Sequence, residues 1–204
     1  MLWLPEPAPS LAPAAAANLA STELKNAVSA VLVAYRAIDT LQEKVVLLRA
    51  IIGVWSLAPD HFWGGRPGQR QPRDADGVLA FLGQLLPPAG IVISVYSVWV
   101  SAADPGGAFQ GGTILAAIWR LARTAGLTDA PPIERRWLRA IVIGGPTVFL
   151  VIGLAGFVIA GHFLAYPIGF AKPLIVIIEA ALTLSIAALL ALLVAGPPER
   201  APDA

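Results

Sequence analysis

The 204-residue chain contains no cysteine and only two histidines, His61 and His162. The absence of cysteine excludes disulfide bonds, thiolate-ligated iron–sulfur clusters and thiol catalysis. Two histidines do not favour a bis-histidine haem or a histidine-based zinc site. The sequence also lacks a phosphate-binding loop, a nucleophile–base pair and a metal-ligand spacing. We therefore expect no enzyme activity, no catalytic residue, no metal and no cofactor.

Charged residues are scarce as well. They make up 13% of the chain, whereas a typical soluble domain carries about 25%. Hydrophobic residues make up 57% and are arranged in long blocks, and the mean hydropathy is +0.72. This composition predicts an all-α, polytopic membrane protein. We expect the lipid bilayer to surround it, and we expect no nucleic-acid partner.

The apolar blocks predict about five transmembrane helices. They cover residues 41–57, 77–100, 109–127, 137–160 and 173–195. An amphipathic helix over residues 26–40 is expected to lie near the membrane surface ahead of them. Pro87 and Pro88 occupy the middle of the second block and remove two backbone hydrogen bonds, so we expect a kink or unwinding there.

This pattern divides the chain into five parts. They are a disordered or interfacial arm (1–20), an amphipathic helix with the first transmembrane helix (21–58), a loop (59–76), a four-helix membrane domain (77–196) and a disordered tail (197–204). Five spans place nine basic residues on one side and four on the other. Basic residues favour the cytoplasmic side of a bacterial inner membrane. This predicts an N-terminus outside the cell and a C-terminus in the cytoplasm.

A glycine-rich segment separates the second and third predicted spans. We interpret it as a structural hinge formed by Pro105, Gly106, Gly107, Phe109, Gly111 and Gly112. Glycine permits a tight turn and close approach of neighbouring helices, and Gly107 and Gly111 form a GxxxG pair. On these residues alone, the segment fits a tight turn in any membrane protein.

The string from Asp104 to Gly112 also resembles the PGGGFxGG signature of the MnhB/MrpB family, with Ala108 in place of the third glycine. Members of this family are membrane subunits of multisubunit sodium/proton antiporters and of related hydrogenase and complex I-like machines. The resemblance covers roughly residues 78–196. It implies that this part of the chain is a membrane subunit of such a complex.

A second charged constellation lies ahead of the first apolar block. Arg36, Asp39 and Glu43 share one helical stripe, and Lys44 follows directly. The stretch is similar to the FRGxDTxxE segment in the C-terminal part of the large, MrpA-type antiporter subunit. This resemblance implies that Glu43 belongs to an ion route, with Asp39 and Arg36 as its electrostatic frame. Alternatively, Lys44 holds Glu43 in one charge state, and Glu43 then relays no protons.

Glu179 is a further candidate, because it lies within the fifth predicted span among apolar residues. Charged groups inside a bilayer are costly and usually face a partner, a cavity or an ion path. Glu179 is therefore a candidate proton carrier, and the alternative is that it only bonds a neighbouring subunit. The ion-pathway candidates are Glu43, Asp39, Arg36, Lys44 and Glu179.

The two resemblances together imply a non-catalytic membrane subunit of a cation/proton-translocating Mrp-type antiporter complex. Such a subunit would help to form or seal the ion route beside other membrane subunits. The transported ions would be protons, with sodium as the second candidate. Two alternatives stay open: a cofactor-free membrane-arm subunit of a redox-driven complex I-like or hydrogenase complex, and a structural scaffold without ion contact.

Overall fold

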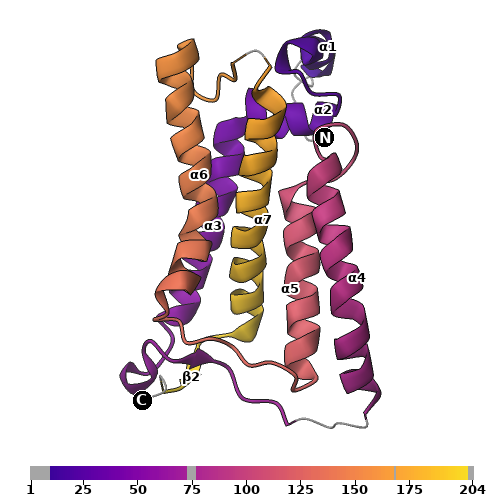
Figure 1. The fold of residues 1–204 in the computed structure, drawn as a ribbon. Helices are drawn as coiled ribbons and strands as arrows, with labels where there is room; N and C mark the ends of the chain where they lie inside the picture. The colour runs from indigo at the N-terminus through magenta and orange to yellow at the C-terminus, as the bar shows by residue number, and fades with distance from the viewer. Residues whose placement is uncertain (1–9, 73–76, 168, 202–204) are drawn as a thin grey trace, which may run out of the picture.

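The computed structural model describes residues 10–72, 77–167 and 169–201, in which long helices dominate (Figure 1). The longest are α3 (Ala37–Trp55), α4 (Val78–Val100), α5 (Ala108–Thr124), α6 (Arg136–Ala160) and α7 (Ala171–Ala195). Shorter elements are α1 (Ala12–Ala17), η1 (Leu19–Thr22), α2 (Ala27–Ala30), the π-helical η2 (Val31–Tyr35), η3 (Asp60–Phe62), β1 (Arg66–Pro67) and β2 (Pro198–Arg200). The long helices run antiparallel to their neighbours in sequence, so their connections gather at two ends of the bundle.

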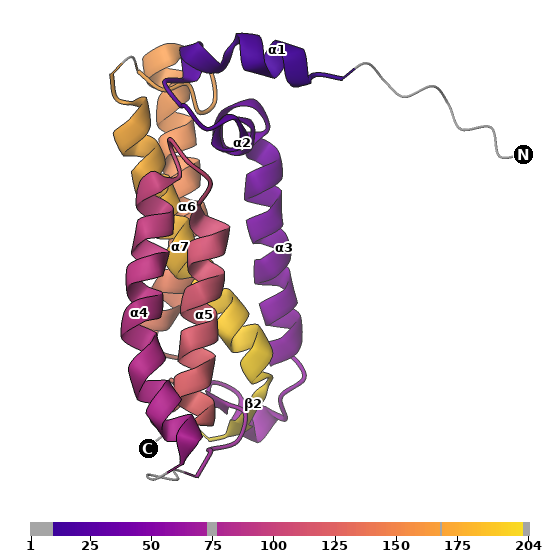
Figure 2. The ribbon, with the colours of Figure 1, turned by 90° about the vertical axis from the view of Figure 1, so that its right-hand side faces the viewer.

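Helix α7 forms the core of this bundle. Figure 1 shows α7 between α6 and α5, and Figure 2 shows α4 and α5 side by side with α3 at the other side of the bundle. Half of the most apolar stretch of α7 is buried, compared with 22% in α4 and 28% in α6. Ser185 of α7 donates a hydrogen bond to the carbonyl of Val142 in α6 at 2.6 Å. The less buried helices α4 and α6 therefore present most of their apolar surface outward.

Three helices of the described residues, α4, α6 and α7, are long and apolar enough to cross a membrane. They coincide with the predicted spans at 77–100, 137–160 and 173–195. The other two predicted spans also form helices, but these differ from the three in length or composition. Helix α5 has only 17 residues, and α3 carries four charged residues within its 19.

The predicted amphipathic helix over residues 26–40 is not one continuous helix. The backbone breaks at Arg36 (φ −126°, ψ 36°), after the π-helical turn and before α3 begins. The Thr40 hydroxyl donates to the carbonyl of Leu32 at 2.6 Å and ties the two segments together across this break. Asp39 therefore lies in the first turn of α3, on the same helix as Glu43 and not on a separate surface helix.

The expectation for Pro87 and Pro88 was a kink or unwinding of the helix. Helix α4 stays helical through both prolines, so unwinding does not occur. Helix α4 packs closely on α5 just after the prolines, where a Cβ atom added to Gly90 would lie only 2.6 Å from the Cγ2 atom of Ile118. The Ser94 hydroxyl further donates to the carbonyl of Gly111 in α5 at 2.9 Å.

The arm expected to be disordered or interfacial and the tail expected to be disordered both contain structure where they are described. Helix α1 and the 3₁₀ helix η1 lie within the predicted arm, whose residues 1–9 fall outside the described residues. In the predicted tail, β2 pairs antiparallel with β1, with Arg66 opposite Arg200 and Pro67 opposite Pro198. This small sheet joins the C-terminal segment to the loop after α3.

Candidate functional site

The glycine-rich hinge forms a tight turn that folds back onto the end of α4. The N–H group of Gly107 donates to the carbonyl of Ser97 at 3.0 Å. Gly107 adopts φ +140° and ψ 179°, a conformation that is essentially restricted to glycine. Helix α5 begins at the next residue, Ala108. The turn therefore directs the first free N–H groups of α5 toward α7.

Glu179 of α7 occupies this helix start. Its Oε2 atom accepts a hydrogen bond from the backbone N–H of Ala108, and only 6% of the residue is exposed. The N-terminus of a helix carries partial positive charge and unsatisfied N–H groups, which stabilise a carboxylate. A Cβ atom on Gly107 would lie 3.3 Å from Oε2, so the bare glycine backbone allows the carboxylate to approach.

Lys44 of α3 brings a buried cation to the same region. Its side chain is 4% exposed, and its Nζ atom lies 3.3 Å from Oε2 of Glu43. The Nζ atom also lies 5.1 Å from the centroid of the Phe109 ring, a distance that permits cation–π attraction. Glu43 is more accessible, with 54% of its side chain exposed. Glu43 is therefore the outer member of this ion pair, and Lys44 is the inner member.

These groups share one small cavity of about 120 Å³. Its lining includes Glu43, Lys44, Gly107, Phe109, Gln110 and Glu179. Two carboxyl groups, one ammonium group and the glycine hinge thus meet although they lie far apart in the sequence. No cluster of three or more histidine, aspartate or glutamate residues that could hold a metal occurs in the described ranges.

Arg36 and Asp39 lie outside this cavity. They form an ion pair with each other near the start of α3, with side chains 71% and 47% exposed. Gln110 is a cavity residue that the sequence reasoning missed. Its Oε1 atom would lie 3.3 Å from a Cβ atom on Gly107. The available signal was its position as the only polar side chain between Pro105 and Gly112.

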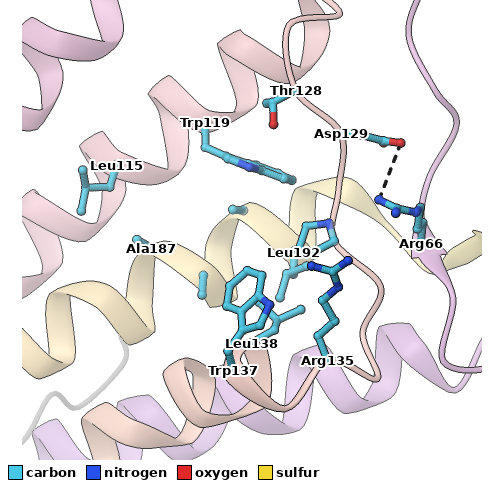
Figure 3. A pocket seen from close by; sticks show the side chains of 13 residues that line it. Arg66, Leu115, Trp119, Thr128, Asp129, Arg135, Trp137, Leu138, Ala187 and Leu192 are labelled. Atoms are coloured by element: carbon cyan, nitrogen blue, oxygen red, sulfur yellow. Dashed lines mark ion pairs between the residues drawn. The ribbon is translucent and has the colours of Figure 1, made fainter. Parts of the chain in front are cut away.

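A larger pocket of about 470 Å³ lies at the opposite end of the bundle, between α5, α6 and α7 (Figure 3). Asp129, in the loop before α6, borders it and receives two hydrogen bonds from the guanidinium group of Arg200 at 2.7 and 2.8 Å. Arg66 lies 3.9 Å from the same carboxylate. The hydrogen bonds from Arg200 are the main reason that the pKa of Asp129 falls to about 2.

The lowered pKa of Asp129 predicts an acid-sensitive contribution to stability. Because the folded-state pKa lies below the ordinary value of 3.8, the contribution is present above pH 4 and is lost as the pH falls toward 2. We expect about 1–2 kcal/mol after solvent screening. Thermal unfolding of the purified protein from pH 6 to pH 2, compared with Asp129→Asn, measures it. Identical pH profiles of the two proteins would contradict the assignment.

Three helices in the described part of the chain are long and apolar enough to cross a membrane, which defines the class as helical membrane proteins. The sequence model of the domain related to the MnhB subunit of Na+/H+ antiporters matches residues 78–197, more than half of the chain. The chain belongs to this family.

Three further similarities accompany the family match. The fold is similar to a chain of the membrane-bound sulfane sulfur reductase, an archaeal respiratory membrane complex, with a TM-score of 0.75, 24% identity, and coverage of 94% of this chain and 87% of that chain. It is also similar to the Mrp complex from Dietzia sp. DQ12-45-1b, with a TM-score of 0.70, 24% identity, and coverage of 98% of this chain and 24% of that chain. The uncharacterized protein MJ1307 of Methanocaldococcus jannaschii is 26% identical over 156 residues, which are 69% of this chain. The match spans 60% of the length of that relative.

Proposed function

We propose that the chain is a non-catalytic membrane subunit of a cation/proton-translocating Mrp-type antiporter complex. Its ion-pathway candidates are then the residues of the 120 Å³ cavity, namely Glu43, Lys44 and Glu179. The observation that carries the proposal is the buried carboxylate of Glu179, which shares this cavity with the Lys44–Glu43 pair. An ionisable group is kept inside a bilayer mainly where it faces a partner, a cavity or an ion path.

The charge of the cavity supports cation binding. When all three groups are ionised, two carboxylates and one ammonium group leave a net charge of −1. An uncompensated charge in a low-dielectric interior is costly. One proton or one sodium ion restores neutrality. The cavity is therefore suited to take up and release a single cation, with the exposed carboxylate of Glu43 toward the surface and Glu179 inside.

The proposal extends to the membrane topology. We assign five spans, α3 to α7, in a bacterial inner membrane, with the N-terminus outside and the C-terminus in the cytoplasm. Two features support this: the antiparallel course of the five helices, and the gathering of Arg66, Arg135 and Arg200 at one end of the bundle. Residues 21–58 are assigned to an MrpA C-terminal-like segment, and residues 77–196 to the four-helix MnhB/MrpB-like domain.

A cofactor-free membrane-arm subunit of a redox-driven complex is the second candidate function. The observation that favours it is the match to the sulfane sulfur reductase chain, which covers 87% of that chain, whereas the match in the Mrp complex covers 24% of a longer chain. Purification from native membranes in mild detergent, with mass spectrometry of the co-purifying chains, separates the two. Large antiporter-like subunits alone support the antiporter, and additional iron–sulfur proteins support the redox-driven complex. A chain that purifies alone as a stable oligomer would overturn both.

Glu43→Gln tests whether the cavity takes part in transport, and Asp39→Asn is its matched control. Both residues lie near the start of α3 and both are partly exposed, but only Glu43 lines the cavity. We expect Glu43→Gln to slow proton uptake by vesicles that contain the assembled complex by about threefold to tenfold, since the Glu43 side chain is half exposed and is less enclosed by this chain than Glu179. Asp39→Asn should leave the rate unchanged. If both variants transport at the rate of the parent complex, Glu43 does not belong to the ion route. That result would favour a structural scaffold without ion contact.

A further inference from the structure

The 470 Å³ pocket at the basic end of the bundle has the chemistry of a lipid site, and it is separate from the ion cavity. Its apolar wall comes from Leu115 of α5, Leu138 of α6 and the last turns of α7, including Ala188 and Leu192. Figure 3 shows Trp119 reaching in from α5, and Trp137 and Arg135 from the start of α6. Tryptophan side chains are characteristic of the depth at which lipid headgroups begin.

The charged groups of the pocket lie at one border of this apolar wall. The charged lining residues are two arginines and one aspartate, with a net charge of +1: Arg66, Arg135 and Asp129. The carboxylate of Asp129 is already held by two hydrogen bonds from Arg200. Arg135 is exposed, and within the described part of the chain no carboxylate lies within ion-pair distance of it. The charge available to a ligand is therefore the guanidinium group of Arg135.

The Trp119 side chain is also in contact with the guanidinium group of Arg123. The guanidinium carbon of Arg123 lies 5.7 Å from the centroid of the Trp119 ring, and Arg123 is buried. Its Nη2 atom donates to the carbonyl of Pro67 at 2.6 Å and so anchors the stack to the loop that carries Arg66. One wall of the pocket is thus fixed by the same loop that provides part of its charge.

We propose that this pocket binds an anionic phospholipid, with its phosphate on Arg135 and its upper acyl chain against the apolar wall between Trp119 and Trp137. Basic pockets between transmembrane helices at the cytoplasmic side are suited to anionic headgroups. A protein partner would leave the guanidinium of Arg135 without a counter-charge unless it supplied a carboxylate. A phospholipid supplies both the charge and the apolar chain, and the surrounding bilayer contains it.

The test places a photoreactive group in the pocket. The complex is purified through a tag on this chain, with Trp137 replaced by p-benzoylphenylalanine, and is reconstituted in vesicles of equal parts phosphatidylglycerol and phosphatidylcholine. After irradiation, mass spectrometry of this chain measures its lipid adducts. We expect severalfold more phosphatidylglycerol than phosphatidylcholine adducts. The same probe at Trp99, an exposed residue of α4, is expected to show no headgroup preference.

Arg135→Gln should abolish the preference at position 137, whereas Arg136→Gln should preserve it. Arg136 is also exposed and is the adjacent residue, but it does not line the pocket. Equal adducts of both lipids, a cross-link to a neighbouring subunit, or no lipid adduct would each overturn the proposal. Should the substitution at Trp137 prevent assembly, the same probe at Trp119 decides by the same criteria. The result is independent of transport activity, because no residue of the ion cavity is altered.

Discussion

Replacing Glu179 with glutamine is expected to lower proton-coupled transport by the assembled complex by at least about tenfold. The effect should exceed that of Glu43→Gln, because Glu179 is buried and water cannot readily take over its role. Glutamine has nearly the same shape, and its carbonyl oxygen can still accept the hydrogen bond from the N–H of Ala108. It cannot carry a negative charge or exchange a proton. The variant should therefore fold and assemble, but it should not transport.

The measurement is proton uptake by vesicles that contain the complex, together with the yield of co-purified subunits. Glu134→Gln is the control, because Glu134 is exposed and lies in the loop before α6, at the other end of the bundle. Normal transport by Glu179→Gln in a fully assembled complex would show that this carboxyl group is structural. Loss of assembly with Glu179→Gln would instead show that the negative charge is needed for the fold of this chain, because the carboxylate is buried and bonds Ala108 within the chain.

The sequence predicted the positions of the long helices because their apolar blocks are long and end at glycine, proline or charged residues. Residues 77–100, for example, form α4 at Val78–Val100. The shorter elements were harder to predict. The π-helical turn ending at Tyr35 depends on contacts such as the hydrogen bond from Thr40 to Leu32, and β2 depends on pairing with a loop more than 120 residues away. Neither has a signal in local hydropathy.

Several residues of the cavity were named from the sequence, but Gln110 was missed and the assembly of these residues into one cavity was not predictable. Charge inside an apolar block identified Glu179, glycine content identified the hinge, and the resemblance to the MrpA-type segment implied a role for Glu43 in an ion route. Sequence spacing grouped Arg36, Asp39 and Glu43 on one stripe, whereas the structure pairs Arg36 with Asp39 near the surface and Glu43 with Lys44. It places Lys44 and Glu179 in one cavity although they lie on different helices. Helical spacing relates residues of one helix only, so contacts between α3, α5 and α7 needed the tertiary structure.

Gly107→Ala is expected to destabilise the protein by about 1–3 kcal/mol through backbone strain alone. Gly107 holds φ +140° and ψ 179°, where a residue with a Cβ atom is strained. The added methyl group would also lie 3.3 Å from Oε2 of Glu179, closer than most Cβ contacts. The carboxylate would have to move away from the N–H of Ala108, and a buried hydrogen bond to a charged group would be weakened at a further cost of about 1–3 kcal/mol.

Gly144→Ala is the matched control, because Gly144 lies within α6 and no atom lies within 4 Å of its added Cβ. Alanine favours a helix over glycine by about 0.5–1 kcal/mol, so this variant should be at least as stable as the parent protein. Thermal unfolding of the purified complex in one detergent compares the three proteins. Equal melting temperatures for both variants would contradict the strained geometry of Gly107. A lower melting temperature for Gly107→Ala with unchanged transport would show that the backbone conformation of Gly107 is needed for stability. It would also show that Glu179 can act in transport without the exact geometry of the hinge.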